Sequence, residues 1–304
     1  MQIKAKIRPW QITVTVFVCA LLALNAATHT LHTYHWFTLL AIPAAFLSGE
    51  RGRCFFFDWL PLFLFWVGYD RLRLLQWFLL GRVAVEWPYA LEKTMFGWIS
   101  GGSIPPHSAR QWLAARSGTL MGSTLKWSAQ IVYLSQIFTV PSLMLCWWIL
   151  GWSRQSFRQR FVRHLYAFTA LNAMGLITYL LVPVAPPWWV TIWGMVQPSA
   201  ELVSKTQVSG GMDGKLIQET IKTAPDWFAA IPSLHGAYPV LLLLLARRNG
   251  NLSTQAAIWI YIATMWISCV VLNQHYLIDL IAGALAALAA WQVGDWLYAR
   301  KYSP

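Results

Sequence analysis

Two histidines and one aspartate in the last quarter of the chain have types and spacing that suit nucleophilic chemistry. His275 and Asp279 are four residues apart, so on a helix they lie on the same face. An aspartate that accepts the proton of one imidazole nitrogen fixes the tautomer and leaves the other nitrogen free to attack. The spacing therefore predicts that His275 is a nucleophile oriented by Asp279.

A second histidine, His235, follows Pro232 and Ser233, which are typical of the first turn of a helix. The free N–H groups and the positive dipole end of a helix N-terminus bind phosphate oxygens. A protonated histidine beside them is placed to donate to a leaving oxygen. We expect His235 and His275 to flank one phosphorus atom, although each pattern by itself also occurs in purely structural helices.

The composition is that of an integral membrane protein. Hydrophobic residues make up 57% of the 304 residues and charged residues 11%, whereas soluble domains carry about a quarter charged residues. The net charge of +12 is carried in short clusters at the ends of apolar runs, where anionic lipid head groups lie. The partner is therefore a membrane and not nucleic acid. The four cysteines form no CxxC pair, which argues against a zinc site or a disulfide framework.

The elements that must position these residues are transmembrane helices. A bilayer core of about 30 Å needs roughly 20 mostly apolar residues for each span. We expect an all-α, polytopic bundle with about eight spans, at 11–27, 34–49, 55–80, 124–151, 161–182, 232–247, 254–272 and 275–297. The second is short and contains Pro43, so seven spans or a re-entrant hairpin are the alternatives.

The organisation expected is a single integrated membrane domain. Residues 1–123 hold the N-terminal spans and an interfacial segment, and residues 124–304 form the catalytic bundle. Eight spans place both termini and every short, strongly basic loop in the cytoplasm. The long connections 81–123 and 183–231 then lie outside. The first is predicted to form an interfacial helix and turn, and the second has Pro and Trp residues followed by a more polar stretch. Both histidines stand at outer helix mouths, facing the periplasm, the cell exterior or an organelle lumen.

Several of these segments resemble a known family. The run from Pro232 to His235 resembles the second motif of the type 2 phosphatidic acid phosphatase superfamily, and the run from His275 to Asp279 resembles its third. Further segments are similar to inositol phosphorylceramide synthases and their bacterial relatives: Pro183 to Trp188, Gln274 to Tyr276, Tyr69 to Arg73, and Tyr133 to Ser135. The resemblance implies a six-helix catalytic core, attack by His275 through a phosphohistidine, and protonation of the leaving alcohol by His235. It requires no metal and no organic cofactor.

The chain departs from the phosphatase branch at two phosphate-binding cations. The first motif of that branch, with its Lys and Arg-Pro, has no match, and Ser268 is followed by Cys269 where the third motif has Ser-Arg. Other groups must stabilise the charge on the equatorial oxygens. Our candidates are Arg71, Arg73 and Ser233, with Lys126 and Lys222 as weaker ones. The two arginines also fit an interfacial snorkelling pair.

The leading hypothesis is a membrane lipid phosphotransferase that moves a phospho-alcohol head group, for example phosphoinositol, between lipids. Its partners are a phospholipid donor and a lipid-alcohol acceptor, as in sphingolipid or glycolipid synthesis. The rival enzyme is a lipid or polyprenyl phosphate phosphatase. Two alternative hypotheses belong to other classes of protein. One is a membrane electron carrier with His235 and His275 as axial haem ligands, and the other is a proton-coupled transporter.

The charge distribution predicts the side of the membrane on which the chemistry occurs. A cysteine introduced near Ser209, in the second long connection, is expected to react with an impermeant maleimide in intact cells. A cysteine placed near Arg154 should react only after lysis and serves as the control. The reverse pattern of labelling means that the orientation is inverted.

Overall fold

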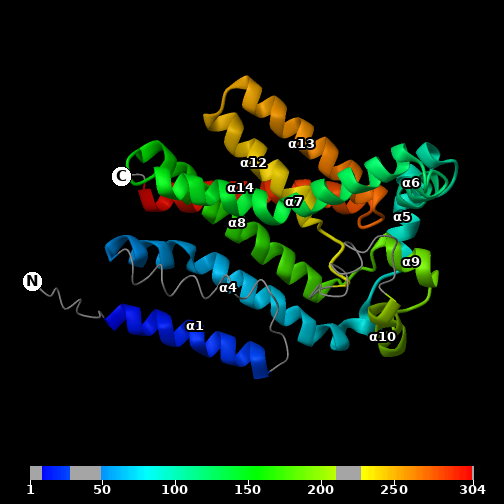
Figure 1. The fold of residues 1–304 in the computed structure, drawn as a ribbon, viewed down its shortest axis with the longest axis horizontal. Helices are drawn as coiled ribbons and strands as arrows, with labels where there is room; N and C mark the ends of the chain where they lie inside the picture. The colour runs from blue at the N-terminus through cyan, green and yellow to red at the C-terminus, as the bar shows by residue number, and fades with distance from the viewer. Residues whose placement is uncertain (1–8, 28–48, 210–226, 303–304) are drawn as a thin grey trace, which may run out of the picture. The chain divides into compact units, whose positions relative to one another are not determined.

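The computed structural model describes residues 9–27, 49–209 and 227–302. Within them the regular structure is helical and no strand is formed (Figure 1), in agreement with the all-α prediction. The chain divides into two compact units, Met1–Arg71 and Leu72–Pro304. The predicted catalytic part, residues 124–304, lies wholly within the second unit. The predicted span 34–49 falls almost entirely outside the described residues.

The first unit contains α1 (Pro9–Ala27) and most of α4 (Glu50–Leu79). Val14 and Val18 of α1 are buried against Phe56 of α4. The ring of Phe17 meets Phe56 edge to face, with 6.3 Å between centroids. Aliphatic and aromatic contacts of this kind hold two apolar helices together.

The second unit is built on five long helices. These are α7 (Leu120–Leu150), α8 (Gln155–Leu181), α12 (Leu234–Asn249), α13 (Leu252–Val271) and α14 (Leu277–Tyr302). The last helix, α14, packs along α8 and α12, while α13 packs against α12 and α7 (Figure 1). Three of them begin at a residue whose side-chain oxygen accepts an N–H of the first turn, namely Thr119, Ser233 and Asn251. These caps explain where the helices start.

The two long connections fold into short helices, which the sequence predicted for the first connection; its interfacial position stays a prediction. The first forms η2 (Leu80–Arg82), α5 (Glu86–Phe96), η3 (Gly97–Ser100) and α6 (Pro105–Ala114). The second contains α9 (Pro187–Trp193) and α10 (Ala200–Ser209). Parallel backbone bridges join Ala84 to Val184 and Val184 to Ala229. Segments far apart in sequence are thereby tied together at one end of the bundle.

Three helices of the described chain are long and apolar enough to cross a membrane: α8, α13 and α14. A fourth is α7 if its two parts, which meet at 41°, form one span. The bend lies near Ile137, whose carbonyl would bond to residue 141 in a straight helix; Pro141 has no N–H to donate. The helix α12 has only 16 residues. A multi-pass membrane bundle is therefore confirmed, whereas the count of eight spans stays a prediction.

The backbones of α12 and α14 touch where the two helices cross. A Cβ atom on Gly236 would lie 2.8 Å from Cα of Leu280, and one on Gly283 would lie 2.2 Å from the carbonyl oxygen of Ser233. The N–H of Ser233 donates to the carbonyl of Asp279 at 3.0 Å. The first turns of both helices are thus held against each other, and only glycine fits at the two contact positions.

We expect Gly283→Ala to force α12 away from α14, because the new methyl group has no space beside Ser233. Overpacking of this kind costs about 1–3 kcal/mol. Thermal unfolding of the detergent-purified protein, followed by circular dichroism, should show a lower midpoint. Gly81→Ala is the matched control, since a Cβ there meets no atom within 4 Å. Equal midpoints for the two variants would contradict this account of the crossing.

Candidate active site

The crossing of α12 and α14 brings the two predicted histidines together. His235 is the second residue of α12, and His275 lies two residues before α14 begins. Their ring centroids are 5.5 Å apart, with an angle of 47° between the planes. A single tetrahedral group has the size to contact both rings from one side. The arrangement fits the expectation that His235 and His275 flank one phosphorus atom.

Asp279 lies beneath His275, one turn along the chain. Its Oδ2 atom is 3.4 Å from Nδ1 of His275, at the outer edge of hydrogen-bond range. The same oxygen accepts the N–H of Tyr276 at 2.8 Å, which holds the carboxylate in place. Asp279 is fully buried and His275 is 8% exposed. Because Nδ1 faces the carboxylate, Nε2 is the nitrogen available for attack.

The turn between α13 and α14 fixes the position of His275. The N–H groups of Gln274 and His275 both donate to the carbonyl of Cys269, at 2.9 and 3.4 Å. Asn273 adopts a left-handed conformation, with φ at 57°, which asparagine tolerates better than most residues. Its side-chain amide donates to Thr191 Oγ1 of α9 at 2.7 Å. The turn is therefore anchored both to α13 and to α9.

His235 is held by aromatic stacking and by the start of its helix. The ring of Tyr133, on α7, stacks on His235 with 4.0 Å between centroids and 13° between planes. The Oγ atom of Ser233 accepts the N–H of Gly236 at 3.2 Å, and Tyr179 donates to the carbonyl of Pro232 at 2.8 Å. Ser233 thus forms the predicted helix cap. Its role in binding phosphate stays a prediction.

Glu92 on α5 is a site residue that the sequence analysis missed. Its two carboxylate oxygens accept the N–H groups of Leu277 and Ile278, at 2.9 and 3.1 Å, and the side chain is fully buried. Burial raises the pKa of Glu92 to about 7; the two backbone donors oppose this rise and the charge of Asp279 adds to it. In the sequence Glu92 precedes Lys93, which is the pattern of a solvated helix face, and no local signal points inward.

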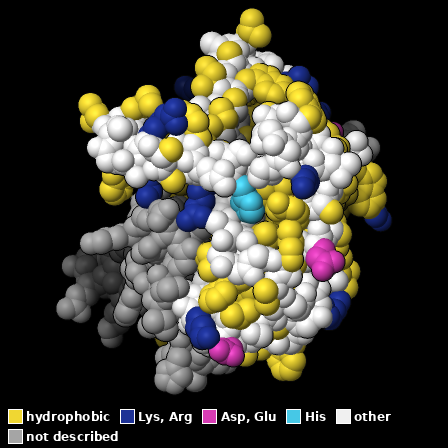
Figure 2. All heavy atoms as spheres, turned by 90° about the vertical axis from the view of Figure 1, so that its right-hand side faces the viewer, with side chains coloured by type: hydrophobic (Ala, Val, Ile, Leu, Met, Phe, Trp, Pro, Cys, Tyr) yellow, Lys and Arg dark blue, Asp and Glu magenta, His cyan; other side chains and the backbone are white. Residues whose placement is uncertain are grey.

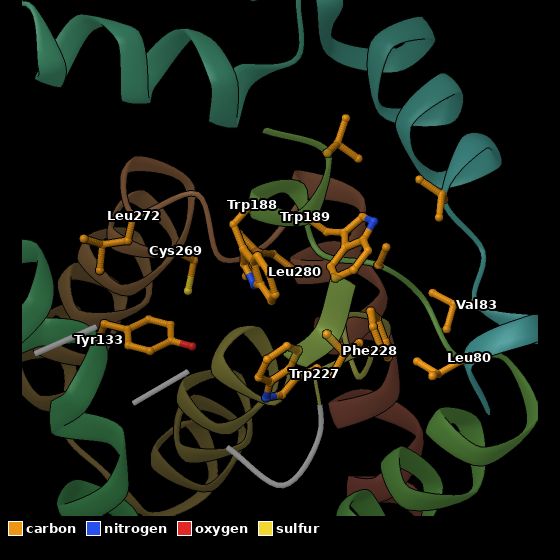
Figure 3. Packing of buried hydrophobic residues seen from close by; sticks show 14 of the residues in the cluster. Leu80, Val83, Tyr133, Trp188, Trp189, Trp227, Phe228, Cys269, Leu272 and Leu280 are labelled. Carbon is orange, nitrogen blue, oxygen red and sulfur yellow. The ribbon is translucent and has the colours of Figure 1, made fainter. Parts of the chain in front are cut away.

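Aromatic side chains from the second long connection surround the start of α14. Trp188 meets Trp227 edge to face at 6.0 Å, and Trp189 meets Phe228 at 5.5 Å. These rings belong to one buried cluster with Leu280 of α14 (Figure 3). We call these four aromatic residues the aromatic roof. It is contributed by α9 and by the segment before α12, and it packs in the same cluster as Leu280, the residue that follows Asp279.

The predicted phosphate-binding cations are placed less closely. Lys126 is on α7, two turns before Tyr133 and on the same helix face, about 10 Å along the axis. Arg71 ends the first unit, the side chain of Arg73 is outside the described ones, and Lys222 lies outside the described residues. On the face of the molecule that lies to the right in Figure 1, Lys and Arg side chains and a histidine side chain lie among hydrophobic side chains (Figure 2). The roles of Arg71, Arg73 and Lys126 stay predictions.

The geometry does not suit a haem held between the two histidines. A porphyrin needs an open layer between its axial ligands, but α12 and α14 are in backbone contact beside the rings. Tyr133 already covers one face of His235. In the described part of the chain, no group of three or more His, Cys, Asp and Glu side chains has the arrangement of a metal site.

Residues 107–293 match the family model of the PAP2 superfamily. This region is more than half of the chain, and the protein belongs to the PAP2 superfamily. It includes His235, His275 and Asp279, whereas Glu92 lies outside it.

Two named proteins are similar to this chain in sequence. The chain is 27% identical over 290 residues to phosphoinositol dihydroceramide synthase of Bacteroides thetaiotaomicron, covering 92% of this chain and 90% of the relative. It is 26% identical over 141 residues to inositol phosphorylceramide synthase of Candida albicans, covering 45% of this chain and 30% of that relative. No solved structure matches the chain significantly. The family resemblance predicted from the motifs is confirmed, and the protein is a membrane protein of lipid metabolism.

Proposed function

We propose that the protein is a lipid head-group transferase that moves a phospho-alcohol from a phospholipid to the hydroxyl of a second lipid. The observation that supports this most is the 5.5 Å separation of His235 and His275, with Asp279 beside the second ring. The name of the Bacteroides thetaiotaomicron relative makes phosphatidylinositol and dihydroceramide the first substrates to test. The active site faces the outer or lumenal side of the membrane.

In the first half-reaction Nε2 of His275 attacks the phosphorus of the donor phospholipid. The bond from phosphorus to the diacylglycerol oxygen breaks, and the electron pair leaves with that oxygen, which takes a proton from His235. Asp279 holds the proton on Nδ1 and stabilises the positive charge that develops on the imidazole. The products are diacylglycerol and a phosphohistidine that carries the head group.

In the second half-reaction the hydroxyl of the acceptor lipid attacks the same phosphorus. Its proton passes to His235, which the first step left neutral, and the phosphorus–nitrogen bond breaks. His275 and the protonated His235 are thereby regenerated. The N-terminus of α12, which carries His235, is placed to interact with the phosphate oxygens. Lys126, Arg71 and Arg73 are the proposed sources of further positive charge.

The aromatic roof favours transfer to a lipid over hydrolysis. Trp188, Trp189, Trp227 and Phe228 are each less than 5% exposed and pack in one apolar cluster with Leu280 near the start of α14. Such a surface excludes bulk water from a reactive intermediate, as closed active sites do in general. A lipid hydroxyl reaches the phosphohistidine from the membrane, whereas water has to cross this layer.

The proposal is tested with the purified protein in mixed micelles containing phosphatidylinositol and dihydroceramide. Mass spectrometry should detect the phosphoinositol form of dihydroceramide together with diacylglycerol in equal amounts. Omission of the acceptor should stop diacylglycerol release after about one turnover. Steady release of phosphate from a lipid phosphate monoester, independent of any acceptor, would show instead that the protein is a phosphatase.

We expect His275→Ala to abolish the transfer, because no nucleophile remains. Asp279→Asn should leave a trace, lowered on the order of 10³- to 10⁴-fold, since the imidazole is then held in the wrong tautomer. His164→Phe is the matched control: His164 is buried in α8, and neither ring nitrogen bonds to another described residue. If His275→Ala were as active as the control variant, the proposed mechanism would be ruled out.

The role of His235 is tested by varying the leaving group. With a diacylglycerol leaving group, His235→Ala should lower the rate about 10²- to 10⁴-fold, because the departing oxygen needs a proton. With a nitrophenyl phosphodiester the leaving oxygen needs no proton, and the loss should be much smaller. The measurement is the initial rate of each reaction. A uniform loss across both leaving groups would mean that His235 binds phosphate and is not the acid.

A further inference from the structure

Three successive N–H groups at the start of α14 are each bonded to a carboxylate. Tyr276 donates to Asp279 Oδ2 at 2.8 Å, Leu277 to one oxygen of Glu92 at 2.9 Å, and Ile278 to the other oxygen at 3.1 Å. Such N–H groups have no partner within the helix and usually bond to a nearby capping side chain or to water. Here the cap for two of them comes from α5, about 185 residues earlier in the chain.

We propose that Glu92 is a positioning residue for the reaction proposed above, and that it holds the first turn of α14 so that Asp279 faces His275. The inference rests on the proposed function of His275 as the nucleophile. Glu92 acts through the helix backbone, not through contact with substrate.

The geometry of the contact is that of a two-point clamp. An acceptor with one oxygen leaves the bonded turn free to rotate about the hydrogen bond. Glu92 binds two neighbouring N–H groups through two separate oxygens, which fixes the rotation of the turn as well as its position. Asp279 belongs to the same turn and directly follows Ile278. A rotation of the turn therefore moves its carboxylate directly.

The contact between His275 and Asp279 tolerates little displacement of either side chain. At 3.4 Å it is already at the outer limit of a hydrogen bond, so a further displacement of about 1 Å breaks it. A misplacement of that size at a catalytic group costs about 10²-fold in rate. The clamp by Glu92 is therefore expected to influence the rate of the chemical step more strongly than the binding of lipid.

A purely structural cap would be built differently. Glu92 is fully buried and close enough to Asp279 for the two like charges to repel. Burying a carboxylate is costly even when it is hydrogen-bonded. A neutral side chain from the turn itself, like Ser233 at the start of α12, caps a helix without that cost. The buried, two-oxygen cap occurs at the helix that carries the nucleophile's partner.

Hydrogen–deuterium exchange tests the clamp without any substrate. Glu92→Gln keeps the volume of the side chain but leaves one acceptor oxygen, so one of the two N–H groups loses its bond. Peptides that contain residues 276–280 should exchange about tenfold faster or more in this variant, while the rest of α14 is unchanged. Glu86→Gln, at an exposed position of the same helix α5, is the matched control and should leave exchange unaltered.

Kinetics with phosphatidylinositol and dihydroceramide tests the positioning role. In Glu92→Gln kcat should fall about 10- to 100-fold, with KM for both lipids within about twofold of the wild-type value. Glu92→Asp retains both oxygens on a shorter side chain and should recover part of kcat. If Glu92→Gln does not fold, the same measurements on Glu92→Asp provide the test.

The outcomes separate the hypotheses. Unchanged exchange in both Glu92 variants would overturn the clamp. Faster exchange with unchanged kcat, or a change in KM alone, would overturn the positioning role. A wild-type protein that transfers no head group would reject the proposed function, and the exchange data would still decide whether Glu92 holds the turn.

Discussion

The candidate site depends on the backbone contact between α12 and α14. Gly236 and Gly283 let the helices approach until the N–H of Ser233 bonds to the carbonyl of Asp279. This bond sets the register of the two first turns, so residues 40 positions apart in sequence have rings only 5.5 Å apart. With a side chain at either glycine the helices would stand further apart. The rings would then no longer reach one tetrahedral group.

The two long connections contribute side chains that pack against the start of α14. The first supplies Glu92, which holds the start of α14, and the second supplies the aromatic roof. Parallel bridges between Ala84, Val184 and Ala229 tie the two connections together. Apolar surface around charged groups strengthens every electrostatic interaction among them, because less water screens the charges. The same surface that excludes water therefore also strengthens the contact between His275 and Asp279.

Local patterns were enough to find the histidines and Asp279, because a spacing of four residues and a Pro-Ser helix start are visible in a short stretch of sequence. The helical fold and the helical character of the first long connection followed from apolar runs and from the positions of Trp and Pro. Glu92 was invisible because its partners are 185 residues away and its neighbour Lys93 suggests a solvated face. The contact positions of Gly236 and Gly283 depend on the crossing of two helices, which no local pattern encodes.

The two cations of the phosphatase branch that have no match here are consistent with the kind of phosphate that the proposed reaction uses. A phosphate monoester carries about −1.5 to −2 charges near neutral pH, and its release requires strong positive charge around the oxygens. A phosphodiester such as phosphatidylinositol carries a single negative charge on phosphorus throughout both half-reactions. A helix N-terminus contributes roughly half a positive charge, and a protonated His235 contributes one more. Together these charges, about +1.5, exceed the single charge of a diester but leave a fully ionised monoester about half a charge short. The proposed head-group transfer therefore needs no further cation, whereas the removal of a terminal phosphate does.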